Sequence, residues 1–320
     1  MTLLHCSVLR ASFFVAALVA ALAACQRNDA VFEDAAVAVD APPNSGAGPG
    51  GGMLSELRFA VVGDTRPSLP DDTANYPTSV VAQIWTQVAA SNPQFGVTTG
   101  DYMFATTAGN EQNAQLDAYL GARGNYGGIV YPALGNHECT NDTFSNCGDG
   151  NTDGKPRNYK AYLDRLVGPI GETRPYFIER FAGTDGSWSA KFVFVAANAW
   201  DGRQATWLDA VLQQPTTYTF VVRHEPHEAT AAPGVAPSVA IVAKHPVTLN
   251  LVGHIHTYRH DPASLELLVG NGGAPLSTAV DFGYTIIGRK PDGSLDISSF
   301  DYVTNALIDE FAINADGSPH

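Results

Sequence analysis

The sequence predicts an α/β domain in which strands alternate with helices, and its additional strand pairs predict a second sheet. Three observations support this fold class. Short apolar runs alternate with segments whose apolar residues recur at helical spacing, and several of the runs end at a glycine that precedes Asp or Asn or His. The chain has 320 residues, of which 45% are apolar, so it can bury a large core.

In the first part of the domain, strands and helices are expected to alternate strictly. Val80, Ile84 and Val88 recur at helical spacing after the first apolar run, which predicts a helix there. In chain order, we expect strands at 57–62, 95–99 and 129–134, and helices at 80–88, 111–120 and 159–166.

The second part is expected to begin with two paired strands, at 176–181 and 191–197. A helix at 204–212 and strands at 218–222 and 247–252 follow. The C-terminal part is expected to form short strands at 265–269, 284–288 and 295–300, separated by turns.

Five of the strands stop at a small polar cluster. In open α/β sheets ligands bind beyond the carboxyl ends of the strands, so these clusters can converge in one crevice. The clusters are Gly63-Asp64, Gly100-Asp101, Gly135-Asn136-His137-Glu138, Arg223-His224 and Gly253-His254-Ile255-His256.

The N-terminal segment is predicted to be an export signal rather than part of the fold. Arg10 precedes an uncharged apolar run at 11–24, too short to favour a spanning helix, and the small residues before Cys25 resemble a bacterial lipobox. The alternative is an ordinary cleaved signal. We therefore expect a signal peptide at 1–24, a flexible tether at 25–55 and a domain at 56–320. A lipid on Cys25 would anchor the protein in the bacterial cell envelope, at the outer membrane or on the periplasmic side.

Cys139 and Cys147 are the cysteines left outside the signal and lipobox. In an oxidising compartment they predict a short-loop disulfide. The alternative is a metal-binding pair, which the spacing and the lack of a nearby His disfavour.

The formal net charge of −14 excludes a nucleic-acid binder, because neutralising phosphates needs clustered Lys and Arg. It does not exclude a phosphate-ester substrate, since bound cations reverse the sign of a local site. We expect a monomer that acts on a small phosphate ester.

As an ordered set, the five clusters resemble the motifs of calcineurin-like metallophosphoesterases, over about residues 56–260. Gly-Asn-His-Glu together with Gly-His-x-His-x-Tyr is similar to the purple-acid-phosphatase branch. The resemblance implies a four-layer α/β/β/α sandwich of two mixed sheets flanked by helices. It also implies two metal ions at one rim, in an enzyme that hydrolyses phosphate monoesters or diesters.

The same resemblance implies the metal ligands. Asp101 would bridge both ions. Asp64 and His256 would complete the first site; Asn136, His224 and His254 would complete the second. Mixed oxygen and nitrogen ligands suit Fe, Mn or Zn.

His137 is not a ligand in this pattern and would protonate the leaving group as a general acid. Glu138 would orient His137 or another neighbour.

Two positions depart from the family pattern. Where its members carry Asp-x-His, this chain has Arg66, and where the purple enzymes carry a tyrosine ligand, it has Phe104. An iron–tyrosinate is thus unsupported unless Tyr102 takes that place. Either water completes the first site, or that site binds weakly and the enzyme depends on its second ion. Arg66 is expected to hold the substrate phosphate bidentately; the alternative is an ion pair with a nearby Asp.

Two other functions fit the same residues. A non-catalytic lipoprotein could keep the pocket to bind phosphorylated ligands, which the absence of a His at position 66 favours and the presence of His137 disfavours. A hydrolase with a single metal ion is the other alternative.

Overall fold

The computed structural model describes residues 45–139, 141–148 and 156–320, which belong to a compact unit at Ala41–His320. The predicted signal and lipobox, with Cys25, lie outside the described residues. No helix in the described part of the chain has the length and apolar character needed to cross a bilayer.

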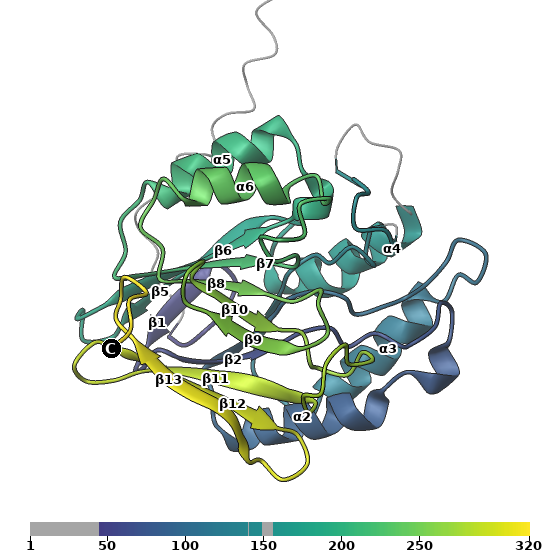
Figure 1. Cartoon of the computed structure of the whole chain (residues 1–320), viewed down its shortest axis with the longest axis horizontal. Helices are drawn as coiled ribbons and strands as arrows, with labels where there is room; N and C mark the ends of the chain where they lie inside the picture. Colours follow the sequence, from purple (N-terminus) through teal and green to yellow (C-terminus); the bar gives the residue numbers. More distant parts are fainter. Residues whose placement is uncertain (1–44, 140, 149–155) are drawn as a thin grey trace, which may run out of the picture. The chain divides into compact units, whose positions relative to one another are not determined.

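Within the described residues the strands form two mixed sheets (Figure 1). Sheet A has the order β1-β5-β6-β7-β8-β10-β9, and sheet B has the order β13-β12-β11-β2-β3-β4. The bounds in sheet A are β1 Gly51–Leu54, β5 Phe177–Gly183, β6 Ser189–Val195, β7 Tyr218–Arg223, β8 Leu249–Val252, β9 Tyr258–Asp261 and β10 Glu266–Val269. Those in sheet B are β2 Arg58–Val62, β3 Phe95–Thr98, β4 Val130–Pro132, β11 Gly283–Arg289, β12 Leu295–Asp301 and β13 Leu307–Ile313.

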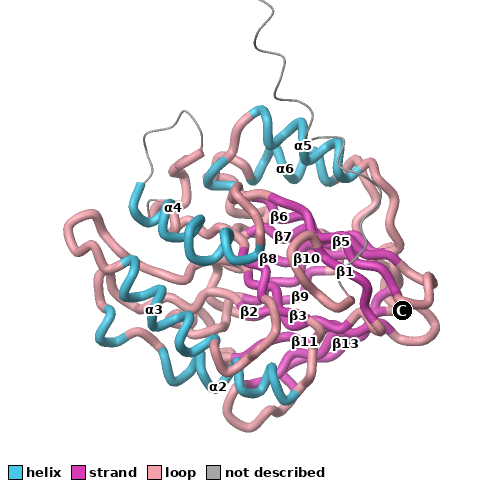
Figure 2. Tube along the Cα trace, turned by 180° about the vertical axis from the view of Figure 1, so that it is seen from behind, coloured by secondary structure: helices cyan, strands magenta, loops and turns pink. Residues whose placement is uncertain are grey.

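Helices cover the outer face of each sheet (Figure 2). The helices α2 Thr78–Ala90, α3 Gln112–Arg123 and α4 Pro156–Tyr162 belong to sheet B, and α5 Gly202–Leu212 and α6 Val235–Val242 belong to sheet A. Alternation along β2 explains the layers: Phe59 and Val61 enter the core between the sheets, whereas Ala60 and Val62 pack under the helices. The predicted α/β/β/α sandwich is confirmed.

The folded unit begins earlier than predicted. The boundary at residue 56 is wrong, because Gly51–Leu54 forms β1, which pairs in parallel with β5. The glycines that suggested a tether allow this pairing: a Cβ on Gly51 would lie 1.7 Å from the carbonyl oxygen of Arg180. The strands β9 and β13 and the helix α6 were also not predicted.

The strands that carry the polar clusters point to one rim. In sheet B, β2, β3 and β4 are parallel neighbours, and in sheet A, β7 and β8 are parallel neighbours. The carboxyl ends of each group therefore carry their loops to the same edge of the sandwich.

Candidate metal centre

The loops at this rim hold site residues in backbone conformations that side chains rarely adopt. Asp64, Asp101 and His254 have φ values of 58°, 60° and 69°. The left-handed region is costly for residues with a Cβ and is maintained where the surroundings enforce it. Gly100, at φ +109°, is needed for close approach, since a Cβ there would lie 2.7 Å from Nδ1 of His224.

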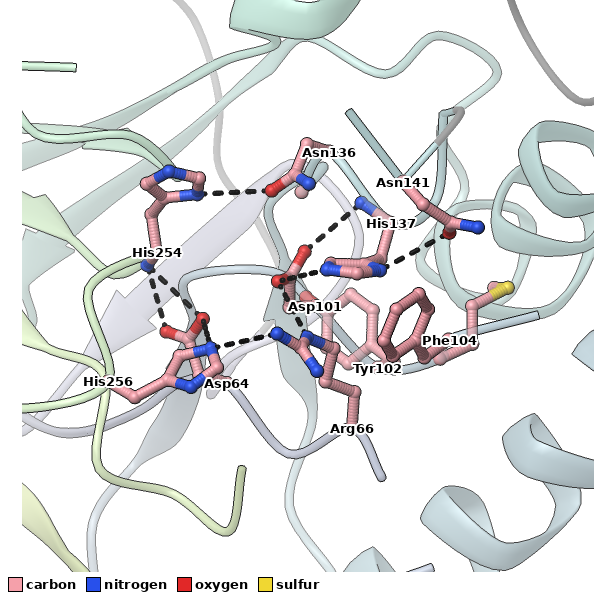
Figure 3. A network of polar contacts seen from close by, with 12 residues as sticks. Asp64, Arg66, Asp101, Tyr102, Phe104, Asn136, His137, Asn141, His254 and His256 are labelled. Carbon is pink, nitrogen blue, oxygen red and sulfur yellow. Dashed lines mark hydrogen bonds and ion pairs between the residues drawn. The ribbon is translucent and has the colours of Figure 1, made fainter. Parts of the chain in front are cut away.

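The second site predicted from the sequence is assembled in the structure. Oδ1 of Asn136 lies 3.1 Å from Nε2 of His224 and 3.1 Å from Nδ1 of His254. The two histidine nitrogens are 3.3 Å apart, and Nε2 of His224 lies 3.2 Å from Oδ1 of Asp101. Figure 3 shows Asn136 and His254 facing each other across this site.

These distances fit a metal ion. Donor atoms that surround an ion at about 2.0–2.2 Å lie about 3.0–3.4 Å from one another in tetrahedral or octahedral geometry. His224 donates its Nδ1–H to the carbonyl oxygen of Thr99 at 2.7 Å, so in the neutral ring, which an ion would bind in place of the Nε2 proton, the lone pair of Nε2 is directed at the site. The second site therefore offers converging lone pairs of the type that transition ions bind.

Glu225 adds a carboxylate that the sequence analysis did not assign to the site. Its donors lie within 4.8 Å of those of His224 and His254. The side chain is fully buried, and neither carboxylate oxygen has a hydrogen-bond partner among the described residues. A buried carboxylate without a partner is costly, so a cation at the second site would stabilise it.

The residues predicted for the first site contact an arginine as well as one another. Asp64 accepts hydrogen bonds from the backbone N–H of His254 at 3.2 and 3.0 Å, and its Oδ1 lies 3.7 Å from Nε2 of His256. Arg66 also contacts the donors of this site: its Nε lies 3.4 Å from Oδ2 of Asp101, and its Nη2 lies 3.3 Å from Nε2 of His256. The ion pair that the sequence left as an alternative for Arg66 is therefore present (Figure 3).

The electrostatics of the rim favour added positive charge. Burial alone would lower the pKa of His224, but the carboxylate of Asp101 outweighs it and raises that pKa well above its usual range. Burial opposes ionisation of Asp101, yet His137 and His224 hold its pKa well below the usual range. In Asp64 burial prevails and raises the pKa well above the usual range.

His137 lies beside the donors rather than among them. Its backbone N–H donates to Oδ1 of Asp101 at 3.2 Å, and its Nε2 lies 3.6 Å from Oδ2 of the same residue. Nδ1 lies 3.2 Å from Oδ1 of Asn141, whose Nδ2 donates to the carbonyl oxygen of Ala105. Because that donation identifies Oδ1 of Asn141 as the acceptor, Nδ1 of His137 carries a hydrogen and Nε2 is the atom that gains or loses a proton.

Asn141 and Phe104 contribute contacts that the sequence analysis did not predict. The ring of Phe104 packs edge-on against His137, with centroids 4.3 Å apart, and its face lies 4.8 Å from Cζ of Arg66. Asn141 orients His137 through the hydrogen bond between its Oδ1 and Nδ1 of the ring. No sequence motif predicts these two roles, because both depend on contacts between loops that are separate in the chain.

Glu138 bonds to backbone N–H groups of the site loops. Its carboxylate accepts hydrogen bonds from the backbone N–H groups of Asp101 at 2.9 Å, Tyr102 at 2.8 Å and Gly135 at 3.0 Å. It therefore holds the loop that positions Asp101. Tyr102 points into the core, where its hydroxyl donates to the carbonyl oxygen of Ala133 at 2.9 Å, so it cannot replace the tyrosine ligand of the purple enzymes.

Other polar residues near the motifs have structural partners instead. Arg223 pairs with Glu266 at 3.1 Å, and His227 lies 2.6 Å from the same carboxylate. The ring of His260 stacks on Phe311 at 3.6 Å. These contacts involve β7, β9, β10, β13 and the loop after β7, and they include none of the predicted metal ligands.

The predicted disulfide is not formed in the structure. Cys139 and Cys147 are buried free thiols, and both donate to the carbonyl oxygen of Asn198, at 3.3 and 3.2 Å. The two thiols share one acceptor and therefore lie near each other, as the predicted disulfide requires. Each thiol makes its own hydrogen bond instead of a sulfur–sulfur bond.

Comparison with known proteins agrees with this geometry. The model of a family described as calcineurin-like phosphoesterase matches residues 57–258. The chain is similar to a purple acid phosphatase from yellow lupin (Lupinus luteus) seeds, with a TM-score of 0.57 and 14% identity over 84% of this chain and 57% of that chain. It is also similar to a dimetal phosphatase from Danio rerio, with a TM-score of 0.55 and 13% identity over 81% of this chain and 99% of that one. The chain thus spans little more than half of the lupin protein, and at these identities both likenesses concern the fold. No curated protein sequence matches the chain.

Proposed function

The chain belongs to the calcineurin-like phosphoesterase family, and from that premise we propose that it is an exported enzyme that hydrolyses small phosphate esters with a transition-metal ion at the rim. Family membership makes it a phosphoester hydrolase. The single observation that carries the more specific proposal is that Asn136, His224 and His254 converge, with Asp101 against His224, at spacings that suit a bound ion. Mixed nitrogen and oxygen donors favour Fe, Mn or Zn.

Each part of the rim has a role in this proposal. A bound ion supplies Lewis acidity, which lowers the pKa of water and offsets charge on phosphoryl oxygens. Asp101, Asn136, His224 and His254 would hold the ion, and Glu138 fixes the loop that presents Asp101. His137, oriented by Asn141, donates a proton from Nε2 to the leaving oxygen.

The proton on His137 depends on the substrate. Burial lowers the pKa of His137 to about 3 in the free protein, so the ring is neutral near pH 7. The negative charge of a phosphate ester raises that pKa, because an opposite charge favours the protonated form. In this proposal, the charge of the bound substrate therefore acts in the direction that favours a protonated His137.

The purple-acid-phosphatase branch is supported only by the Gly-Asn-His-Glu and Gly-His-x-His-x-Tyr motifs. Export and lipid attachment at Cys25 are supported by the N-terminal sequence. Both features are part of the proposal. Labelling with a radioactive fatty acid in the bacterial host, compared with a Cys25→Ser variant, tests the anchor: loss of label in the variant is expected, and an unlabelled wild type contradicts it.

Turnover of p-nitrophenyl phosphate and of its bis ester by the metal-replete protein tests the activity. Hydrolysis of at least one ester, abolished by a chelator and restored by Mn²⁺ or Zn²⁺, is expected. Tight phosphate binding without turnover of either ester would instead identify a non-catalytic phosphoryl-binding lipoprotein.

A further inference from the structure

Arg66 occupies the position that the first site would offer to a second ion. Its Nε contacts Oδ2 of Asp101 at 3.4 Å, and its Nη2 contacts Nε2 of His256 at 3.3 Å. These are donor atoms that an ion in the first site would need. In Figure 3 the guanidinium lies between Asp101 and His256, next to Asp64.

The guanidinium is held there from several sides. Nη1 donates to the carbonyl oxygen of Pro67 at 3.0 Å, and the ring of Phe104 lies 4.8 Å from Cζ. The side chain is only 14% exposed. A cation stacked on an aromatic face and bonded on three nitrogens loses these contacts if it swings away.

The contact with Arg66 involves the nitrogen of His256 that would bind a metal ion. Nδ1 of His256 donates to the carbonyl oxygen of Pro275 at 2.7 Å, so the lone pair is on Nε2 and points to the N–H of Arg66. A lone pair that accepts this hydrogen bond is not free to bind a metal.

We propose that the protein binds a single transition-metal ion, at the second site, and that Arg66 supplies the other positive charge, at the first. This inference rests on the proposed function and revises the expectation of two ions. The potential metal-binding atoms of the two sites differ accordingly. At the second site they converge on one point, whereas at the first site they accept hydrogen bonds from N–H groups.

Arg66 also keeps donors available for substrate. A guanidinium has five N–H bonds. Asp101, His256 and Pro67 take three of them, and the others have no partner among the described residues. The remaining N–H bonds, one on each terminal nitrogen, give the site a fixed cation that can bind a phosphoryl oxygen beside the ion. Arg66 is thus a catalytic residue in this proposal.

Counting bound Mn²⁺ tests the inference independently of activity. The chelator-treated full-length protein is titrated with Mn²⁺, and bound metal is measured by elemental analysis and by electron paramagnetic resonance, which separates an isolated ion from a coupled pair. We expect about one equivalent and an isolated-ion spectrum for the wild type. Arg66→His and Arg66→Ala are expected to take up a second equivalent, with a coupled spectrum in Arg66→His. The matched control is Arg165→Ala, whose arginine pairs with Asp117 away from the rim and whose loss should leave the count at one.

The outcomes separate the inference from the function on which it rests. A wild type that binds two ions with similar affinity and hydrolyses the ester overturns the inference and leaves the proposed function intact. A count that stays at one in both folded Arg66 variants also overturns it, because Arg66 would then not be what excludes the second ion. A wild type that binds one ion but hydrolyses no ester contradicts the proposed function alone.

Discussion

The two halves of the rim use related residue types but differ in where their positive charge comes from. At the second site, Asn136, His224 and His254 face one another, and no lysine or arginine among the described residues is hydrogen-bonded to them. At the first site, Arg66 already lies against Asp101 and His256. In our proposal, this one residue in the loop after β2 supplies the positive charge that a second ion would otherwise bring.

The largest expected effect comes from breaking the second site. His224→Ala removes a ring that contacts Asn136, Asp101 and His254 together, so the protein should no longer retain Mn²⁺ after gel filtration. Ester hydrolysis should fall by more than the ~10–100-fold that loss of an outer-shell partner costs. Thermal unfolding serves as the control for folding. Normal metal retention in folded His224→Ala would refute the assignment of this residue as a ligand.

His137→Ala should lower kcat without changing the metal count. General acid catalysis contributes about 10²–10⁴-fold, and the loss should be greatest for alkyl esters, whose leaving groups need a proton. For p-nitrophenyl phosphate the loss should be smaller, because that leaving group is already a good one. Equal losses for both substrates would show that His137 does not protonate the leaving oxygen.

Asn141→Ala should have a smaller effect of the same kind, because Asn141 acts by orienting His137 through its Nδ1. We expect about a tenfold loss of kcat with little change in KM. Asn141→Asp preserves the acceptor and should restore most of the activity. If both variants lose activity equally, the role of Asn141 is not to accept this hydrogen bond.

A buried carboxylate far from the rim sharpens the electrostatic comparison. Asp101, with cationic neighbours, has a pKa well below its usual range, whereas burial raises the pKa of Glu179 from 4.5 to about 9. Between pH 4.5 and about pH 9, Glu179 keeps its proton in the native state but has lost it in the unfolded state. The stability contributed by protonated Glu179 therefore falls as the pH rises through this range.

Glu179→Gln should therefore match the wild type near pH 5 and exceed it near pH 9 in free energy of unfolding, on the order of 1–3 kcal/mol. Thermal unfolding at both pH values measures this. Glu56→Gln, at an exposed position, is the control and should show no such difference. A constant difference between Glu179→Gln and the wild type across this range would refute the raised pKa.

Much of the fold and most of the second site were predictable because they follow local patterns. Apolar runs such as Phe95–Thr98 end at glycine and a polar residue, and parallel strands bring such ends to one rim. β1 was not predicted because a glycine-rich segment lacks an apolar pattern, and its pairing depends on close approach to Arg180. The sequence also could not decide between an ion pair and a free clamp for Arg66, because its contacts come from loops remote in the chain.

Diffraction from a Mn²⁺-loaded crystal, recorded with the anomalous signal of manganese, tests the central claim most directly. The account predicts one anomalous peak enclosed by Asp101, Asn136, His224 and His254, with Arg66 in place against His256. Two peaks of similar height, with Arg66 displaced from the first site, would contradict it.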